Sequence, residues 1–219
     1  MKRYVRFKNI KHPDFEIVFH KKPSVEADVE ALLKFIHDSV MRGTAYKPGQ
    51  TFEIGWMLCN IESTPSGTLT LFEPDFQSFP INWINSSSHT MLHLRLQRSA
   101  VESINMLEQV DFPRLDTSGL MCNQFTCSDE FIFDRQSKSK DSGWFFGCDN
   151  ESHDHNDITV LSRQSLYALA LLNPNVVHLL ALPVGVSGRV HKRSIELFHD
   201  EQKIELVPES YLDQKYPKS

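Results

Sequence analysis

The segment from 141 to 157 holds the residue types most capable of chemistry in this chain. An aromatic stretch, Trp144, Phe145 and Phe146, leads to Cys148. The nine residues that follow contain four carboxylates and two histidines: Asp149, Glu151, His153, Asp154, His155 and Asp157. Thiol, imidazole and carboxylate groups at this density could bind a metal ion, transfer protons or form a plain solvated loop.

A metal site is one interpretation of this segment. His153 and His155 lie two residues apart, and in an extended segment such residues point to the same side, so both imidazoles could reach one ion. With Cys148 they would form the core of a metal-dependent enzyme. Zinc would need further ligands that the sequence does not single out. Cys122 and Cys127, separated by four residues, fit only the looser spacings of zinc sites.

The sequence gives weaker support to nucleophilic catalysis and to phosphate binding. Ser142 precedes an aromatic strand, whereas a nucleophile elbow needs Gly-x-Ser-x-Gly at a strand-to-helix turn. Cys148 and His153 could form a thiolate pair, but one nearby histidine is weak evidence. The glycines of 183–188 lack the pattern of a phosphate-binding loop. We therefore predict no catalytic residue, no cofactor and no enzymatic activity.

Surface recognition is the interpretation that remains. Three consecutive aromatic residues cannot all face one core, so either the strand is buried on both faces or an aromatic side chain points outward. An outward aromatic beside an acidic loop would resemble an interface with an anchor and a charged rim. A buried strand explains Trp144 at least equally well. The candidate contact residues are Trp144, Asp149, Glu151, His153, Asp154, His155 and Asp157.

Composition limits the function classes. The 219 residues carry a formal net charge of -5, which argues against general nucleic-acid binding because phosphate backbones recruit clustered basic residues. Apolar runs fall short of the ~20 residues of a membrane-spanning helix, and the basic N-terminus lacks the apolar core of a secretory signal. We therefore expect a cytoplasmic protein without membrane contact, whose four cysteines are free thiols.

Helices and strands alternate irregularly along the chain. Apolar residues spaced by three and four predict a helix over 25–42 that Gly43 ends, and weaker patterns predict helices over most of 86–107 and around 160–172. The nearly continuous apolar run 176–182 favours a central buried strand. Further strands are predicted at 4–7, 15–19, 51–61, 68–72, 121–125, 130–133, 143–148, 194–198 and 204–207.

This order predicts an α+β fold, with a mostly antiparallel sheet and flanking helices. Hairpin-type spacings dominate, and the regular strand-helix alternation of a doubly wound sheet is missing. The segment 111–116 predicts a boundary between an N-terminal and a C-terminal part of the chain. We therefore expect an N-terminal α+β portion, 1–112, and a C-terminal domain with the Asp-Ser-Gly-Trp motif, 113–219.

Several motifs together resemble a known family. They are Phe133-Asp-Arg135, Asp141-Ser-Gly-Trp-Phe-Phe-Gly-Cys148, Asp154-His-Asn-Asp157 and Leu179-Leu-Ala-Leu-Pro-Val-Gly185. In this combination the chain resembles the bacterial immunity-protein family numbered thirty-three, formerly a domain of unknown function, whose hallmark is the Asp-Ser-Gly-Trp motif. Upstream segments at 54–56, 69–76 and 92–97 look like regions that accompany this domain, so the resemblance covers roughly 51–212 and leaves the first fifty residues outside.

The resemblance implies a small bacterial protein that is encoded near polymorphic toxins and protects its producer by binding. The leading hypothesis is therefore a non-catalytic immunity-type protein that binds and neutralises a cognate toxin. Two alternatives stay open: a metal-dependent enzyme that uses Cys148, His153 and His155, and a structural accessory domain without a toxin partner.

Overall fold

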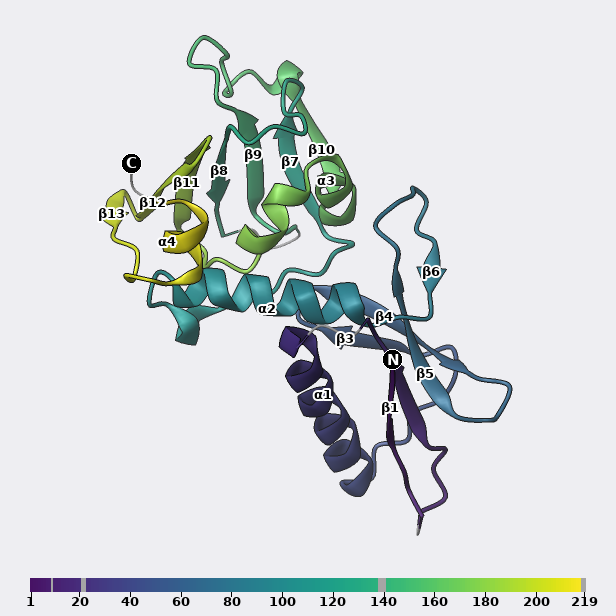
Figure 1. Ribbon diagram of the computed structural model, residues 1–219. Coiled ribbons are helices and arrows are strands. Elements are labelled where there is room, and N and C mark those ends of the chain that lie inside the picture. The colour runs from purple at the N-terminus through teal and green to yellow at the C-terminus, as the bar shows by residue number, and fades with distance from the viewer. Residues whose placement is uncertain (9, 21–22, 138–140, 218–219) are drawn as a thin grey trace. The chain divides into compact units, whose positions relative to one another are not determined.

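The computed structural model describes residues 1–8, 10–20, 23–137 and 141–217, which form two compact units, Met1–Leu94 and Arg95–Ser219 (Figure 1). The boundary falls within helix α2 (Ser88–Glu102). The sequence-based division had placed 95–112 with the N-terminal portion. Hydrogen bonds explain the difference: Gln97 donates to the Val177 carbonyl at 3.0 Å, and Ser103 Oγ accepts from the Leu212 backbone N–H at 3.0 Å.

The first unit holds a six-stranded sheet in the order β1-β2-β5-β4-β3, with β6 paired to β5. Its elements are β1 (Lys2–Val5), β2 (Phe15–Val18), α1 (Pro23–Met41), β3 (Thr51–Ile54), β4 (Met57–Ser63), β5 (Leu69–Pro74) and β6 (Trp83–Ile84). Helix α1 packs on β1 and β2 and ends before Gly43, whose φ of 100° suits a residue without a side chain. The predicted first helix is confirmed.

The second unit holds a seven-stranded sheet in the order β10-β7-β9-β8-β11-β12-β13. Its strands are β7 (Ser118–Cys122), β8 (Phe131–Arg135), β9 (Trp144–Cys148), β10 (Leu161–Ser165), β11 (Val186–His191), β12 (Ser194–His199) and β13 (Gln202–Ile204). Its further helices are η1 (Leu107–Gln109), η2 (Ile158–Val160), α3 (Leu166–Leu172), η3 (Pro174–Leu179) and α4 (Tyr211–Lys215). Helix α3 contacts β7 and β10 on one side of this sheet (Figure 1).

The predicted α+β class is confirmed. Among the described residues, strand pairs are antiparallel except β2 with β5 and β7 with β9. No helix in the described part of the chain combines the length and the apolar character that crossing a membrane requires.

One predicted element of the second unit is wrong, and another is confirmed only in part. The apolar run 176–182 is not a strand: η3 occupies most of it, because Pro174 begins a helical turn and Asn173 Oδ1 accepts from the Asn175 backbone N–H at 3.0 Å. A segment that is buried on all sides is apolar at nearly every position. Its sequence therefore lacks the hydrophobic periodicity that distinguishes a helix from a strand. The predicted helix at 160–172 begins only at Leu166, and the residues before it form β10.

The core of the second unit is aromatic and centres on β9. The rings of Trp144 and Phe146 stack with centroids 5.3 Å apart, and Phe133 of β8 lies 6.1 Å from Trp144. The indole N–H of Trp144 donates to the Leu180 carbonyl at 3.2 Å. Alternate residues of β9 therefore fill one face of the sheet, as the pleat requires.

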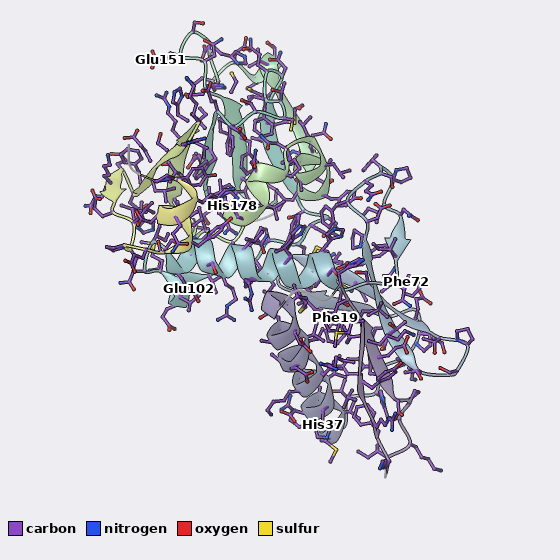
Figure 2. All side chains as sticks on the ribbon, viewed as in Figure 1. Phe19, His37, Phe72, Glu102, Glu151 and His178 are labelled. Atoms are coloured by element: carbon purple, nitrogen blue, oxygen red, sulfur yellow. The ribbon has the colours of Figure 1, made fainter. Side chains whose placement is uncertain are left out.

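His178 of η3 is a buried titratable group in this core (Figure 2). Its Nε2 lies 3.2 Å from the Tyr216 hydroxyl. Burial, with a smaller contribution from Lys215, lowers the pKa of His178 to about 3. The folded state therefore holds a neutral imidazole at pH values where the unfolded chain protonates it.

We expect His178 to make the protein less stable in mild acid. The unfolded pKa is ~6.5, so its contribution to stability is complete above that pH and is lost as pH falls toward the folded value, by up to ~1.4 kcal/mol per pH unit. Urea unfolding between pH 7 and pH 4.5 measures the slope. The same slope in a His178→Gln variant would contradict this assignment, since that variant lacks the titrating ring.

Candidate functional site

The candidate site lies where β7 and β9 end side by side. These strands are parallel neighbours, with Leu120 opposite Phe145 and Met121 opposite Phe146. The register brings Cys122, the last residue of β7, next to Cys148, the last residue of β9. The Cys148 backbone N–H donates to Cys122 Sγ at 3.2 Å. Parallel pairing thus joins two thiols that are far apart in sequence.

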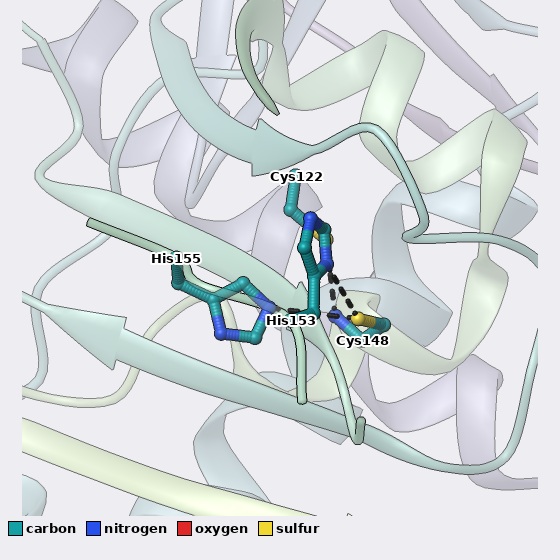
Figure 3. A group of neighbouring side chains, drawn as sticks. All are labelled: Cys122, Cys148, His153 and His155. Carbon is teal, nitrogen blue, oxygen red and sulfur yellow. Dashed lines mark hydrogen bonds between the residues drawn. The ribbon is translucent and has the colours of Figure 1, made fainter. Parts of the chain in front are cut away.

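The loop between β9 and β10, residues 149–160, returns two imidazoles to these thiols. His153 Nδ1 lies 3.0 Å and His155 Nε2 3.5 Å from Cys148 Sγ, and the two imidazole rings are 4.8 Å apart (Figure 3). One potential ligand atom from each of these two histidines and from Cys122 and Cys148 falls within 4.8 Å of all the others. We call these four residues the Cys/His cluster.

Local hydrogen bonds shape this loop. Asn150 Oδ1 accepts from the backbone N–H and the hydroxyl of Ser152 at 3.1 and 2.8 Å, and the His153 backbone N–H donates to the Asn150 carbonyl at 3.0 Å. Asp154 Oδ1 accepts from the Asn156 N–H at 2.9 Å. Side chains that accept from N–H groups two residues further on are typical of tight turns. They fold the loop back toward the strand ends.

No protein-family model, curated protein or solved structure matches this chain. The resemblance to an immunity family therefore remains a prediction, and the function has to be inferred from the geometry of the site.

The sequence pointed to three members of the cluster and missed the fourth. Cys148, His153 and His155 are close together in sequence and in the structure. Cys122 was considered only together with Cys127, which is exposed and lies outside the cluster. No spacing rule links Cys122 to Cys148. Only a prediction that their strands pair in parallel could have identified Cys122 as a member of the cluster.

Electrostatics in the cluster favour uncharged groups when no ion is bound. Burial raises the pKa of the Cys148 thiol. Burial, and secondarily the neighbouring His153, lowers the pKa of the His155 imidazole. Both directions reflect the cost of placing a charge in a partly enclosed site.

Three of the four carboxylates near the cluster differ in their exposure and their partners. Asp149 turns inward, with its side chain only 9% exposed, and pairs with Arg189 at 2.8 Å and His191 at 3.2 Å. Glu151 is 87% exposed at the outer end of the loop (Figure 2). Asp157 Oδ1 accepts from the Thr159 N–H and hydroxyl at 2.9 and 2.8 Å, which caps η2 while the residue stays exposed.

Trp144 does not fit the predicted contact face. Its side chain is 1% exposed, because the register of β9 turns Trp144 and Phe146 together into the aromatic core. The loop does expose one large apolar side chain: Ile158 is 82% exposed. Ile158 is therefore a better candidate than Trp144 for the apolar part of a contact face.

The Asp-Ser-Gly-Trp motif forms a turn that begins β9. The Ser142 hydroxyl donates to the Ser118 carbonyl at 2.7 Å, so it ties β9 to β7. Asp141 accepts from the Gly143 backbone N–H at 3.0 Å and pairs with Arg163 at 2.6 Å. These contacts give the motif a structural role in holding the strand whose other end carries Cys148.

Proposed function

We propose that this protein acts by binding a partner protein through the loop between β9 and β10, and that the partner is a bacterial toxin that it neutralises in the cytoplasm. The supporting observation is the surface of this loop. It exposes the carboxylates of Glu151, Asp154 and Asp157 and the apolar side chain of Ile158. The immunity-family resemblance supplies the class of partner.

A loop that exposes an apolar side chain together with several carboxylates has the composition of a protein interface. Burying Ile158 against a partner would remove apolar surface from water, and the exposed carboxylates of the same loop could then lie at the rim of the contact. Rim charges act mainly on the rate of association, because they attract a surface of opposite charge before contact. The favoured partner is therefore a toxin with a basic surface around its active site, which the bound loop would cover.

A binding experiment tests the proposal. The resemblance implies that a toxin domain is encoded beside this chain. That domain would be purified in a catalytically inactive form and passed over the immobilised protein, and co-expression would show whether the chain restores growth to cells that make the active toxin. We expect a specific complex and protection. A chain that neither binds the adjacent toxin nor protects against it would exclude the immunity function.

We expect the Asp154→Asn/Asp157→Asn double variant to associate with the toxin about 3- to 10-fold more slowly at low salt. Asparagine keeps the carbonyl oxygens that accept from Asn156 and Thr159, so the charge is lost and the fold of the loop is kept. The difference should shrink at 0.15 M salt, where the Debye length is about 8 Å. Stopped-flow association rates across a salt series measure both effects.

The matched control is Asp200→Asn/Glu201→Gln. These residues form the turn after β12, and the strand registers place that turn at the opposite end of the sheet from Cys148. The control removes the same charge from a different place. Equal slowing in both double variants would attribute the effect to net charge and remove the loop from the interface.

A further inference from the structure

We propose that Cys122, Cys148, His153 and His155 bind one zinc ion in a closed tetrahedral site, and that this ion fixes the loop between β9 and β10 on the sheet. The site is independent of the toxin hypothesis: its residues, its ligand and its test involve no partner.

The ligand types favour zinc. Two thiols and two imidazoles form a set of soft and borderline donors, and a four-coordinate site with two sulfur and two nitrogen donors is typical of zinc. Calcium and magnesium prefer oxygen ligands, which this cluster does not supply. The composition therefore selects a transition metal, with zinc as the first choice.

The distances suit such an ion. Zn–S bonds of ~2.3 Å and Zn–N bonds of ~2.0 Å in tetrahedral geometry separate ligand atoms by roughly 3.3–3.8 Å. His155 Nε2 and Cys148 Sγ are 3.5 Å apart, His153 Nδ1 and Cys148 Sγ are 3.0 Å apart, and the whole set lies within 4.8 Å. The widest separation must close by about 1 Å, which rotation of the imidazoles and of the Cys122 and Cys148 side chains could supply, to place all four atoms around one centre.

The framework around the ligands is ordered. Both cysteines end strands of the sheet, so the backbone fixes their positions before any ion binds. Gly147 leaves room for the loop: a Cβ there would lie 3.0 Å from His155 Nε2 and 2.9 Å from both Ile132 and Phe145. The ring of Phe145 packs edge-on against His155 at 5.6 Å. Strand ends and packing thus present the donors together.

Four protein ligands imply a structural role. Catalytic zinc sites keep one position for water or substrate, with three protein ligands, whereas structural sites are filled by protein. The Cys/His cluster supplies all four donors. The ion would replace the weak thiol-imidazole contacts by metal-ligand bonds and hold the acidic residues between Cys148 and His155 in one conformation. It would therefore prepare a rigid surface and leave no site for hydrolysis.

A thiolate-imidazolium pair is the competing explanation of the short contact between Cys148 and His153. Such a pair uses one thiolate and one imidazolium. Here Cys122 adds a second thiol, whose Sγ accepts from the Cys148 backbone N–H at 3.2 Å, and His155 adds a second imidazole 3.5 Å from Cys148 Sγ. The metal site accounts for all four residues, while the pair accounts for two.

Metal analysis of the full chain, produced without a histidine tag and reconstituted with Zn²⁺, tests the proposal. We expect one zinc per chain, and replacement by Co²⁺ should give the absorption of a tetrahedral centre with two thiolates. Cys122→Ser and His155→Gln should each lower the affinity by more than about 100-fold, because a lost ligand costs at least as much as a lost outer partner. Cys127→Ser is the control, since its exposed thiol lies outside the cluster and should leave binding unchanged.

Hydrogen exchange adds a readout of the structural role. Amides of 149–157 should exchange more slowly with zinc bound than after chelation, with no change in the first unit. A wild-type chain that takes up no stoichiometric zinc would overturn the proposal, as would full zinc binding by the folded Cys122→Ser variant or a cobalt spectrum of an open, water-bound site. If a variant does not fold, the wild-type stoichiometry and cobalt spectrum decide the question.

Discussion

A Gly143→Ala variant should fail to fold its second unit. Gly143 has a φ of 74°, and a Cβ at this position would lie 1.8 Å from the Gln136 carbonyl oxygen. That oxygen belongs to the backbone, and no side-chain rotation can move it away. The Gln136 N–H also donates to the Gly143 carbonyl at 3.0 Å, so the two segments are tied together where the clash occurs. Strand β9 would have to separate from β8.

We expect the cost to exceed about 4 kcal/mol, a size reached only when a substitution breaks a named structural feature. Thermal unfolding followed by circular dichroism, together with the yield of soluble protein, measures it. Gly67→Ala is the matched control, because Gly67 has a φ of 80° and a Cβ added there would have no atom within 4 Å. It should cost only the ~1–2 kcal/mol of a left-handed conformation. Equal effects at both glycines would show that the clash at Gly143 is relieved.

Removing the counter-ion of Arg135 should also destabilise the protein substantially. This guanidinium is buried, lies 5.3 Å from the centre of the Trp144 ring and pairs with Asp111 at 2.6 Å. It also donates to the main-chain carbonyls of Asp111 and Leu182. Burial lowers the pKa of Arg135, and Asp111 opposes that shift. The carboxylate therefore offsets part of the cost of a buried charge.

We expect Asp111→Ala to destabilise the protein by about 2 kcal/mol. Fully buried pairs lose ~3–5 kcal/mol when one partner is removed, and the value here is smaller because the Asp111 side chain is 58% exposed and water screens the pair. Urea unfolding of wild type, Asp111→Ala, Arg135→Met and the double variant forms a double-mutant cycle. In the Arg135→Met background the Asp111 substitution should cost little. An undiminished cost there would mean that Asp111 stabilises the fold without Arg135.

Much of the fold follows from local patterns in the sequence. The spacing of apolar residues from Val25 to Val40 is enough to predict α1, because a helix must bury one stripe of side chains. The aromatic run from Trp144 to Phe146 predicts β9, and the structure shows that Trp144 and Phe146 share its buried face. The run at 176–182 could not be assigned in this way, since it is apolar at every position but one and is buried whichever element it forms.

The candidate site, too, could be predicted only in part from the sequence. That a thiol, two imidazoles and several carboxylates follow one strand can be read from the chain, because these residues are close neighbours in it. Which of them meet depends on the folded arrangement. Cys122 lies in the cluster because β7 and β9 pair in parallel. Trp144 is buried because the pairing of β9 turns it toward the core. Asp149 is largely buried and forms an ion pair with Arg189. Contacts between distant segments depend on strand pairing and register, which local spacing does not encode.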